Sequence, residues 1–312
     1  MRRITLTMQN FRSWAGILVL MITLSGFGAC QGQGVGVYSR LGLSPNGEHL
    51  IYVFADRSVG AANENDNVYW LQPSVGSANV VRLSTTGEIL VGYVTCISWE
   101  RGLRAWAGIE AYSETEVYQI DPLTQQSVHF MNLVGHSLRG CSFDPRTPNL
   151  LYFASEPTID MAAKSDLYTL DVNTLTVTRL TDTPDEAETA PTWSQDGTFL
   201  VYGVYGGVNI QDREGNIRFV SGVNGDAFRY ALSPDGKWFL SIGGYRDPGL
   251  FLVSAADGAS RRVSFEAYGY VSWGGDRVAL ITVGVPGRNE LVIKTVEELG
   301  IPEHIKAIEK DR

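Results

Sequence analysis

The motif Trp193-Ser194-Gln195-Asp196-Gly197, followed by the apolar run Leu200-Val201-Tyr202, decides the fold because it recurs along the chain. Its other copies, some of them weak, begin at Leu43, Trp99, Phe143, Leu232 and Ser272. In the clearest copies a proline presets φ, Asp or Asn bonds to nearby backbone, and Gly supplies a positive φ. Each copy therefore predicts a tight turn between two strands. The copies lie about 40 to 55 residues apart, and a repeat of this length is typical of propeller blades.

A second pair of strand-like segments follows each copy. Its first member is a short apolar run such as Leu167-Tyr168-Thr169-Leu170, and its partner ends in Arg, an apolar residue and Ser or Thr, as in Arg179-Leu180-Thr181. Four strands in each of six successive repeats are the signature of a β-propeller, whose closed ring leaves few free sheet edges. The sequence therefore predicts an all-β fold, a six-bladed β-propeller with four antiparallel strands in each blade.

The predicted propeller is a single domain over residues 38–312. We expect its blades to span roughly residues 38–85, 86–132, 133–181, 182–221, 222–265 and 266–310. Two segments compete for the outer strand of the last blade, namely Glu303–Glu309 and, from the other end of the chain, Gly34–Tyr38. A short helix after Pro302 is the alternative to the first of them.

Residues 38–295 resemble the TolB-type propeller repeat. The resemblance is clearest in Ser165–Asp171, Arg179–Thr181 and Pro191–Gly197. It implies the propeller fold and is specific for that fold. TolB itself carries a separate α/β domain before its propeller, which we do not expect here. The role of TolB in the cell envelope and its partner lipoprotein are therefore not carried over.

The first thirty residues predict export and a lipid anchor. Three arginines precede the uncharged, mostly apolar run Trp14–Phe27, which is the layout of a signal peptide. Gly28-Ala29-Cys30 then resembles the bacterial lipoprotein signal, although Phe27 stands where Leu is usual. We expect residues 1–29 to be removed, Cys30 to be lipidated, and residues 30–37 to form a short tether. Plain secretion with cleavage near Ala29 and an uncleaved anchor are the alternatives.

Composition narrows the classes of function. The chain has 25 Lys and Arg against 34 Asp and Glu, a net charge of −9, so we expect no nucleic-acid partner. The nearest match to a nucleophile elbow, Gly135–Gly140, is one residue too long and is not expected to precede a helix. The four histidines fall at unrelated positions of the repeat and do not predict a shared metal site; they are His49, His129, His136 and His304. These observations favour a monomer without catalytic activity and without a cofactor.

Loops on one face carry the candidate binding residues. In a propeller, the connections between the second and third strands and those between blades emerge on the same face, around the mouth of the channel. The candidates are Tyr112, Tyr205, Tyr245, Arg246 and Asp247. Tyrosine provides a large contact area at a low entropic cost and is common at binding hot spots. Packing at strand ends is the alternative interpretation of these tyrosines.

Acidic residues on the same face suggest a second function. Asp182, Asp185, Glu186 and Glu188 link the third and fourth blades, and Asp56, Glu64 and Asp66 are expected in the long loop within the first. Clustered carboxylates of this kind could hold Ca²⁺ through their oxygens. Their spacing matches no EF-hand loop, and a solvated acidic face is the simpler interpretation.

Trp and Cys residues predict features of the core. Trp99, Trp193 and Trp273 align within the repeat and predict wedges that pack between blades. Cys96 and Cys141 are each three residues before the turn, and equivalent residues point the same way around a ring. We therefore expect two buried thiols rather than a disulfide. A slip of one residue in the second repeat would reverse this geometry.

These observations combine into one functional hypothesis. We expect an exported, lipid-anchored propeller that acts as a non-catalytic scaffold of the bacterial cell envelope, in the periplasm or at the cell surface, and binds a protein or glycan partner. The alternative is a metal-dependent binding module or enzyme that uses the acidic mouth of the channel. A structural accessory subunit is a third hypothesis.

Overall fold

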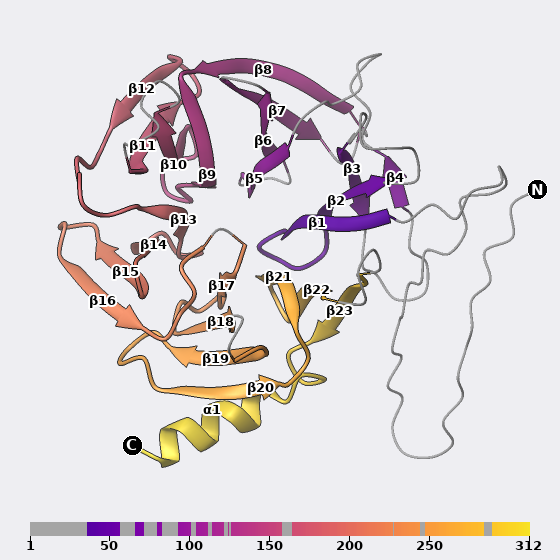
Figure 1. Cartoon of the computed structure of the whole chain (residues 1–312), viewed down its shortest axis with the longest axis vertical. Helices are drawn as coiled ribbons and strands as arrows, with labels where there is room; N and C mark the ends of the chain where they lie inside the picture. Colours follow the sequence, from indigo (N-terminus) through magenta and orange to yellow (C-terminus); the bar gives the residue numbers. More distant parts are fainter. Residues whose placement is uncertain are drawn as a thin grey trace, which may run out of the picture.

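The computed structural model describes residues 36–56, 66–71, 80–82, 93–100, 104–111, 114–121, 124, 126–157, 164–226, 228–243, 247–283 and 289–312. Six antiparallel sheets lie radially around one axis in this part of the chain (Figure 1). The predicted signal peptide, Cys30, Tyr112, Tyr245 and Arg246 lie outside the described residues.

Five sheets have four strands, and we number them blades 1 to 5. Blade 1 contains β1 (Gly36–Leu43), β2 (Leu50–Asp56), β3 (Asp66–Leu71) and β4 (Val80–Arg82). Blade 2 contains β5 (Tyr93–Trp99), β6 (Ala105–Ala111), β7 (Glu114–Asp121) and β8 (Gln126–Val134). Blade 3 contains β9 (His136–Phe143), β10 (Leu150–Pro157), β11 (Asp166–Asp171) and β12 (Thr176–Arg179).

The remaining sheets follow the same order from the axis outward. Blade 4 contains β13 (Thr189–Trp193), β14 (Phe199–Val204), β15 (Gly207–Asp212) and β16 (Ile217–Ser221). Blade 5 contains β17 (Tyr230–Leu232), β18 (Trp238–Ile242), β19 (Leu250–Ser254) and β20 (Ser260–Ser264). The sixth sheet contains β21 (Tyr268–Gly274), β22 (Arg277–Thr282) and β23 (Leu291–Thr295).

The predicted fold class is confirmed, because the chain is an all-β propeller with four-stranded antiparallel blades. The sixth sheet has three strands within the described ranges, so a complete sixth blade is not established. Both predicted sources of its outer strand are wrong. Residues from Gly36 onward pair with β2 as the inner strand of blade 1, and Ile301–Lys310 form the helix α1.

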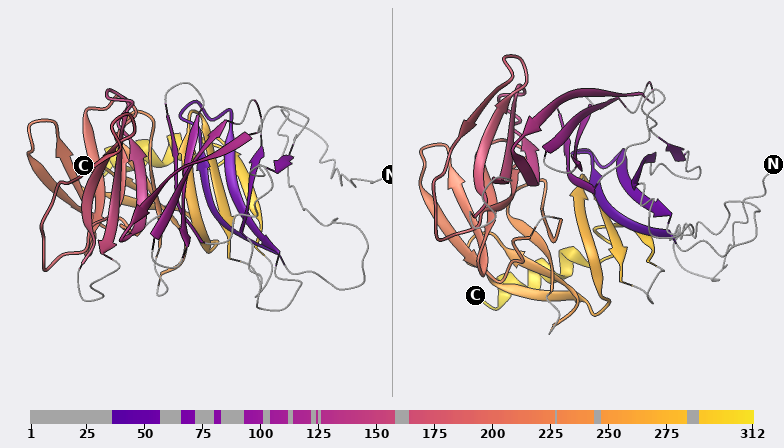
Figure 2. Two further views of the ribbon diagram at one scale, coloured as in Figure 1. Left: turned by 90° about the horizontal axis from the view of Figure 1, so that it is seen from above. Right: turned by 45° about the horizontal axis from the view of Figure 1, so that its top comes forward.

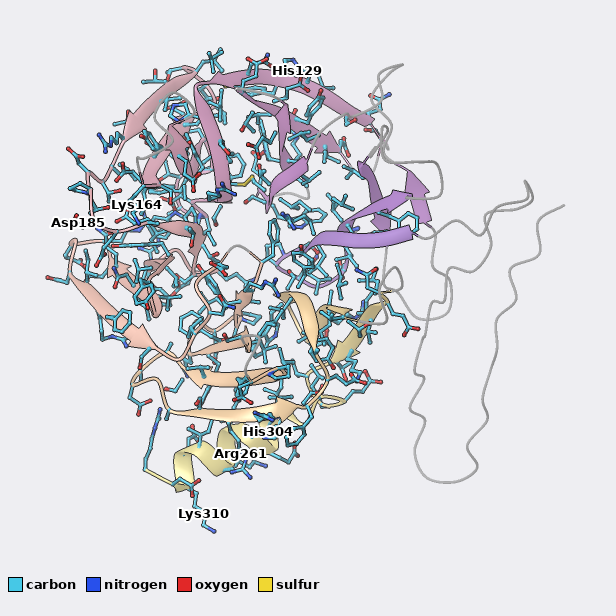
Figure 3. The ribbon with its side chains drawn as sticks, in the orientation of Figure 1. His129, Lys164, Asp185, Arg261, His304 and Lys310 are labelled. Atoms are coloured by element: carbon cyan, nitrogen blue, oxygen red, sulfur yellow. A yellow bond between two sulfur atoms is a disulfide. The ribbon has the colours of Figure 1, made fainter. Side chains whose placement is uncertain are left out.

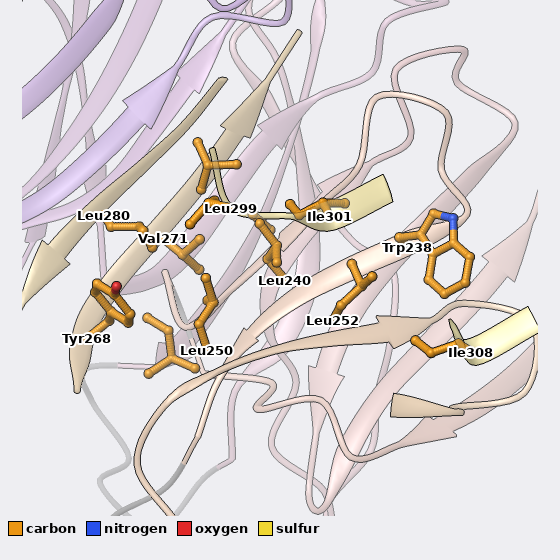
Figure 4. Close-up of a cluster of buried hydrophobic side chains, with 13 residues drawn as sticks. Trp238, Leu240, Leu250, Leu252, Tyr268, Val271, Leu280, Leu299, Ile301 and Ile308 are labelled. Carbon is orange, nitrogen blue, oxygen red and sulfur yellow. The ribbon is translucent and has the colours of Figure 1, made fainter. Parts of the chain in front are cut away.

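Helix α1 covers the outer side of blade 5, beside β20 (Figure 1). Pro302 lies in its first turn, where no backbone donor is needed, and Lys310 lies in its last turn, where a cation favours the helix dipole. Ile301 and Ile308 pack into the cluster that contains Trp238 (Figure 4). The helix is short and amphipathic. In the described ranges, no helix combines the length and the apolar character needed to cross a membrane.

The motif that decides the fold forms a hydrogen-bonded turn between β13 and β14. The N–H of Gly197 donates to the carbonyl oxygen of Ser194 (2.8 Å), and Ser194 Oγ accepts from the N–H of Phe199 (3.1 Å). Asp196 Oδ1 accepts from the N–H of Thr198 (3.0 Å). Gly197 has φ 67°, and the corresponding Gly47 and Gly236 have φ 72° and 71°. The predicted turn chemistry is confirmed in blades 1, 4 and 5.

The direction of the strands defines two faces. Because neighbouring strands are antiparallel, the connections from second to third strand and from blade to blade emerge where the inner strands begin. We call this the loop face, and we call the opposite side, which carries the glycine turns, the turn face. Figure 2 shows the ring from the side, with connections protruding on both faces.

Serine hydroxyls join the inner strands of neighbouring sheets. Each accepts a hydrogen bond from a backbone N–H of the next inner strand: Ser98 from Phe143 (3.0 Å), Ser142 from Trp193 (3.1 Å) and Ser272 from Leu43 (2.9 Å). The axial edge of an inner strand has no further strand to pair with, so these N–H groups need another acceptor. The bond from Leu43 to Ser272 also connects the sixth sheet to blade 1 and so helps to close the ring.

The expectation of two free thiols is wrong, because Cys96 and Cys141 form a disulfide between β5 and β9, with their Cα atoms 5.4 Å apart. The serine bonds show why. Ser98 and Ser142 have the same role, so the residues that follow them, Trp99 and Phe143, are equivalent. Cys96 is three residues before Trp99, whereas Cys141 is two residues before Phe143. Side chains alternate along a strand. The two cysteines therefore face each other across the gap between blades 2 and 3.

Replacing both Cys96 and Cys141 by serine should lower the free energy of unfolding by roughly 2–4 kcal/mol, because the disulfide limits the conformations of the unfolded chain. Urea unfolding with and without a reductant measures this effect. The reductant should destabilise the wild-type protein and leave the double variant unchanged. Alkylation of both cysteines in unfolded, unreduced wild-type protein would contradict the disulfide.

Candidate functional site

A cavity of about 430 Å³ lies on the axis of the ring and is lined by the inner strands of all six sheets. Three of its lining residues are the tryptophans that align within the repeat, Trp99, Trp193 and Trp273. Each also packs into a hydrophobic cluster formed with a neighbouring sheet, as the wedge prediction requires. They therefore serve both the core and the cavity.

The indole N–H groups of these tryptophans differ in their partners. Trp99 Nε1 donates to the carbonyl oxygen of Gly42 (3.0 Å). Trp193 Nε1 and Trp273 Nε1 are buried and find no hydrogen-bond partner among the described residues. A buried donor without a partner is unfavourable. The three tryptophans therefore line the cavity with their rings, while the N–H groups of Trp193 and Trp273 are closed off from solvent.

The cavity is constricted toward the turn face. The side-chain amide of Gln195, on blade 4, donates to the carbonyl oxygen of Pro45, on blade 1 (3.1 Å). These blades lie on different sides of the axis (Figure 1). The bond therefore crosses the channel and narrows it at this end.

The one charged residue in the cavity lining, Asp144, is neutralised by Arg213. Arg213 Nη1 and Nη2 donate to the two carboxylate oxygens at 2.7 and 2.6 Å, and its guanidinium lies 3.9 Å from the Trp193 ring centroid. Burial would raise the pKa of Asp144, but hydrogen bonds from Arg213 and from backbone N–H groups, including that of Arg146, hold it below its ordinary value. The carboxylate therefore stays ionised and paired.

Toward the loop face, the cavity ends beside four residues that we call the mouth cluster: Arg40, Phe228, Arg229 and Tyr270. Arg40 Nε donates to the carbonyl oxygen of Val94 (2.9 Å), and Arg40 Nη1 donates to the hydroxyl of Tyr270 (2.5 Å). The Arg40 guanidinium lies 5.2 Å from the Phe228 ring centroid. The Arg229 guanidinium lies 5.7 Å from the ring centroid of Tyr270.

Sequence reasoning missed the mouth cluster, although a signal was available. Arg40, Arg229 and Tyr270 each stand three residues before the residue that aligns with Trp193 of the motif, namely Leu43, Leu232 and Trp273. One position of the repeat therefore supplies three side chains to the same end of the channel. Repeat six had to be aligned without slip for this to appear.

The predicted loop residues are only partly brought together. Tyr205 lies at the turn between β14 and β15 and is 97% exposed. Asp247 lies before β19 and is ion-paired with Arg262, whose guanidinium lies 4.5 Å from the centroid of the exposed Phe265 ring. The structure therefore joins Asp247 to Phe265 through Arg262, while Tyr205 stands on the neighbouring blade.

The predicted acidic group has separate structural roles. Glu188 is 3% exposed and accepts hydrogen bonds from Thr181 Oγ1 and from the N–H of Leu167. Burial raises the pKa of Glu188 above its ordinary value, and these hydrogen bonds partly offset the rise. Asp182 is ion-paired with Arg179 (2.7 Å).

The other two carboxylates of this group, Asp185 and Glu186, are exposed, and Asp185 lies at the outside of the ring (Figure 3). Two of the histidines, His129 and His304, lie on opposite sides of the molecule in the same view. The described side chains contain no group of three or more His, Cys, Asp and Glu that could hold a metal ion. A Ca²⁺ site at Asp182–Glu188 stays a prediction.

Comparison with known proteins identifies the fold. No family model and no curated protein matches the chain. Among solved structures, TolB from Acinetobacter baumannii is 14% identical over 80% of this chain, with a TM-score of 0.57, and this chain covers 64% of that structure. An oligogalacturonate lyase in complex with manganese is 17% identical over 81% of this chain and 75% of its own, with a TM-score of 0.52.

A protein from Agrobacterium tumefaciens assigned to TolB is 13% identical, over 83% of this chain and 90% of its own length, with a TM-score of 0.53. Identities this low establish a TolB-like propeller fold and nothing about activity. The resemblance found in the repeats is confirmed at the level of fold.

Replacing Glu188 by alanine should lower the free energy of unfolding by roughly 1–3 kcal/mol, because the partly buried hydroxyl of Thr181 loses its acceptor, while the N–H of Leu167 keeps only its bond to Thr181 Oγ1. The matched control Glu186→Ala alters an exposed carboxylate and should stay within about 0.5 kcal/mol of wild type. Urea unfolding in EDTA and in excess Ca²⁺ measures both. Stabilisation of the wild type by Ca²⁺ that Glu186→Ala abolishes would favour a metal site over these structural roles.

Proposed function

We propose that this chain is an exported propeller, anchored by a lipid on Cys30, that acts as a binding scaffold of the bacterial cell envelope and presents its loop face to a protein partner. One observation carries the proposal. The three most exposed large hydrophobic side chains in the described ranges are Tyr205 (97%), Phe265 (82%) and Val134 (75%). Tyr205 and Phe265 lie on connections of the loop face, and Val134 is the last residue of β8, where that strand reaches the same face. Exposed apolar side chains gathered on one face are typical of an interaction surface.

The chemistry of these side chains favours a protein over a glycan. Tyr205 and Phe265 have the aromatic character of hot-spot residues. Val134 is aliphatic and offers no hydrogen bond, so it suits an apolar protein surface better than a hydroxylated sugar. Asp247 and Arg262, which flank Phe265, supply a polar rim of the kind found around such contacts.

The disulfide supports the proposed compartment. Disulfides persist in oxidising environments such as the bacterial periplasm and are rare in the cytosol. The bond between Cys96 and Cys141 joins two blades. The ring is therefore more stable when it folds in a compartment that allows this disulfide to form. Export and the disulfide are consistent with each other, and neither depends on the identity of the partner.

The double variant Tyr205→Ala, Phe265→Ala should reduce capture of the partner at least tenfold, because loss of an aromatic hot spot costs roughly 2 kcal/mol or more. Quantitative mass spectrometry after chemical cross-linking of intact cells measures the captured proteins. The matched control is Phe219→Ala, which removes a half-exposed aromatic (51%) from the outer strand β16. Equal capture by the double variant and the control would contradict binding through the loop face.

Replacing Cys30 by serine should move the protein from the membrane fraction to the soluble extract of the envelope, because an acyl chain contributes about 0.8 kcal/mol for each CH₂ buried in the membrane. Fractionation and the mass of the mature N-terminus are the measurements. The wild type should begin at an acylated Cys30. Unchanged partitioning of the variant would remove the proposed anchor and leave the loop-face proposal intact.

A further inference from the structure

We propose that the channel binds a small organic carboxylate, with its charged head at Arg40 and Arg229 and its apolar body in the axial cavity. This site lies on the axis rather than on the exposed loops, so the inference does not rest on the partner proposed above.

The first argument is the charge of the mouth cluster. Arg40 and Arg229 are both half-buried, and no carboxylate of the described residues forms an ion pair with either. The partners of Arg40, Val94 and Tyr270, are neutral acceptors. A partly desolvated guanidinium without a counter-ion is electrostatically unfavourable, and a planar carboxylate matches its paired donors. An anion from outside the chain would therefore be stabilised here.

The second argument is the convergence of two cations on one ring. The Arg40 and Arg229 guanidinium carbons lie 5.1 and 5.7 Å from the centroid of the Tyr270 ring. Each guanidinium is attracted by the π electrons of the ring, but the two positive charges repel each other. Both guanidinium groups lie within 6 Å of the centroid of one ring, so an anion that reaches this ring would be attracted by two positive charges. The arrangement therefore favours one carboxylate shared by two arginines.

The third argument is the chemistry of the cavity. Its lining is aromatic, aliphatic and hydroxyl-bearing, and its one charged residue, Asp144, is paired with Arg213. A volume of about 430 Å³ suits a small ligand. Phe228 both lines the cavity and contacts Arg40, so the charged mouth and the apolar space are continuous.

The fourth argument concerns the size of the ligand. The bond from Gln195 to Pro45 crosses the channel toward the turn face, so a long chain would not thread through it. The lining beyond the mouth is mostly apolar, so the space that remains suits a compact molecule with an apolar body. These features favour a small carboxylate over a polymer.

Tryptophan fluorescence is the direct test, because Trp99, Trp193 and Trp273 line the cavity. The probes are 3-phenylpropionate, its neutral amide, and inorganic phosphate, each titrated into the folded, exported protein. We expect saturable binding of 3-phenylpropionate at least tenfold tighter than binding of the amide or of phosphate. Equal affinity for the acid and the amide would overturn the role of the arginines.

The variants Arg40→Met and Arg229→Met should each weaken binding of the carboxylate at least tenfold and leave binding of the amide unchanged. The matched control is Arg261→Met, which alters an exposed arginine on the outside of blade 5 (Figure 3). Circular dichroism checks that each variant folds. Should Arg40→Met fail to fold because it loses its bonds to Val94 and Tyr270, Arg229→Met still decides the outcome.

A blocked glutamate-containing peptide is the last probe. Binding of this peptide with the same arginine dependence, while no small carboxylate binds, would overturn the small-ligand inference in favour of an acidic peptide. Loss of affinity in Arg261→Met equal to that in Arg229→Met would also overturn the site. Neither result depends on the loop-face variants, so the two proposals fail independently.

Discussion

The unpaired axial edge of the inner strands is the constraint on which the rest of the structure depends. Each sheet ends at the axis in a strand that pairs on one side only, and its free backbone groups must be satisfied within a ring of such strands. Serine hydroxyls at Ser98, Ser142 and Ser272 meet this need by accepting from the next inner strand. The bond from Leu43 to Ser272 therefore helps to close the ring between the sixth sheet and blade 1.

The same constraint acts at one position of each inner strand. Where this position is a serine, as at Ser98, Ser142 and Ser272, its hydroxyl holds the neighbouring sheet. Two residues before this position, the inner strand is bulged or irregular, with φ 100° at Arg40 and φ 49° at Ala190. A bulge redirects its side chain away from the regular pleat. The side chains at the mouth can therefore differ from blade to blade, because the serine bonds that hold the inner strands together do not involve them.

The sequence predicted the fold well because the turns depend on local chemistry. Asp196 and Gly197 carry their preferences within a few residues. The segment after Pro302 was predicted as a strand of the last blade and is the helix given as the alternative. The disulfide depended on the register of β5 against β9, where one residue decides which way Cys96 points. The mouth cluster depended on residues more than 200 positions apart, since Arg40 meets Tyr270 only when the ring closes. The repeat predicts a ring, but it does not specify which side chains meet where the ring closes.

The negative net charge of the chain and its basic mouth act over different distances. Charges on the outer surface are screened beyond about 8 Å at physiological ionic strength, so the net charge of −9 that the whole chain carries contributes little on the axis. Arg40 and Arg229 act within a few ångströms, beside a cavity whose one carboxylate is already paired. Local charge therefore favours an anion at the proposed channel site, and the overall charge decides mainly what the outer surface repels.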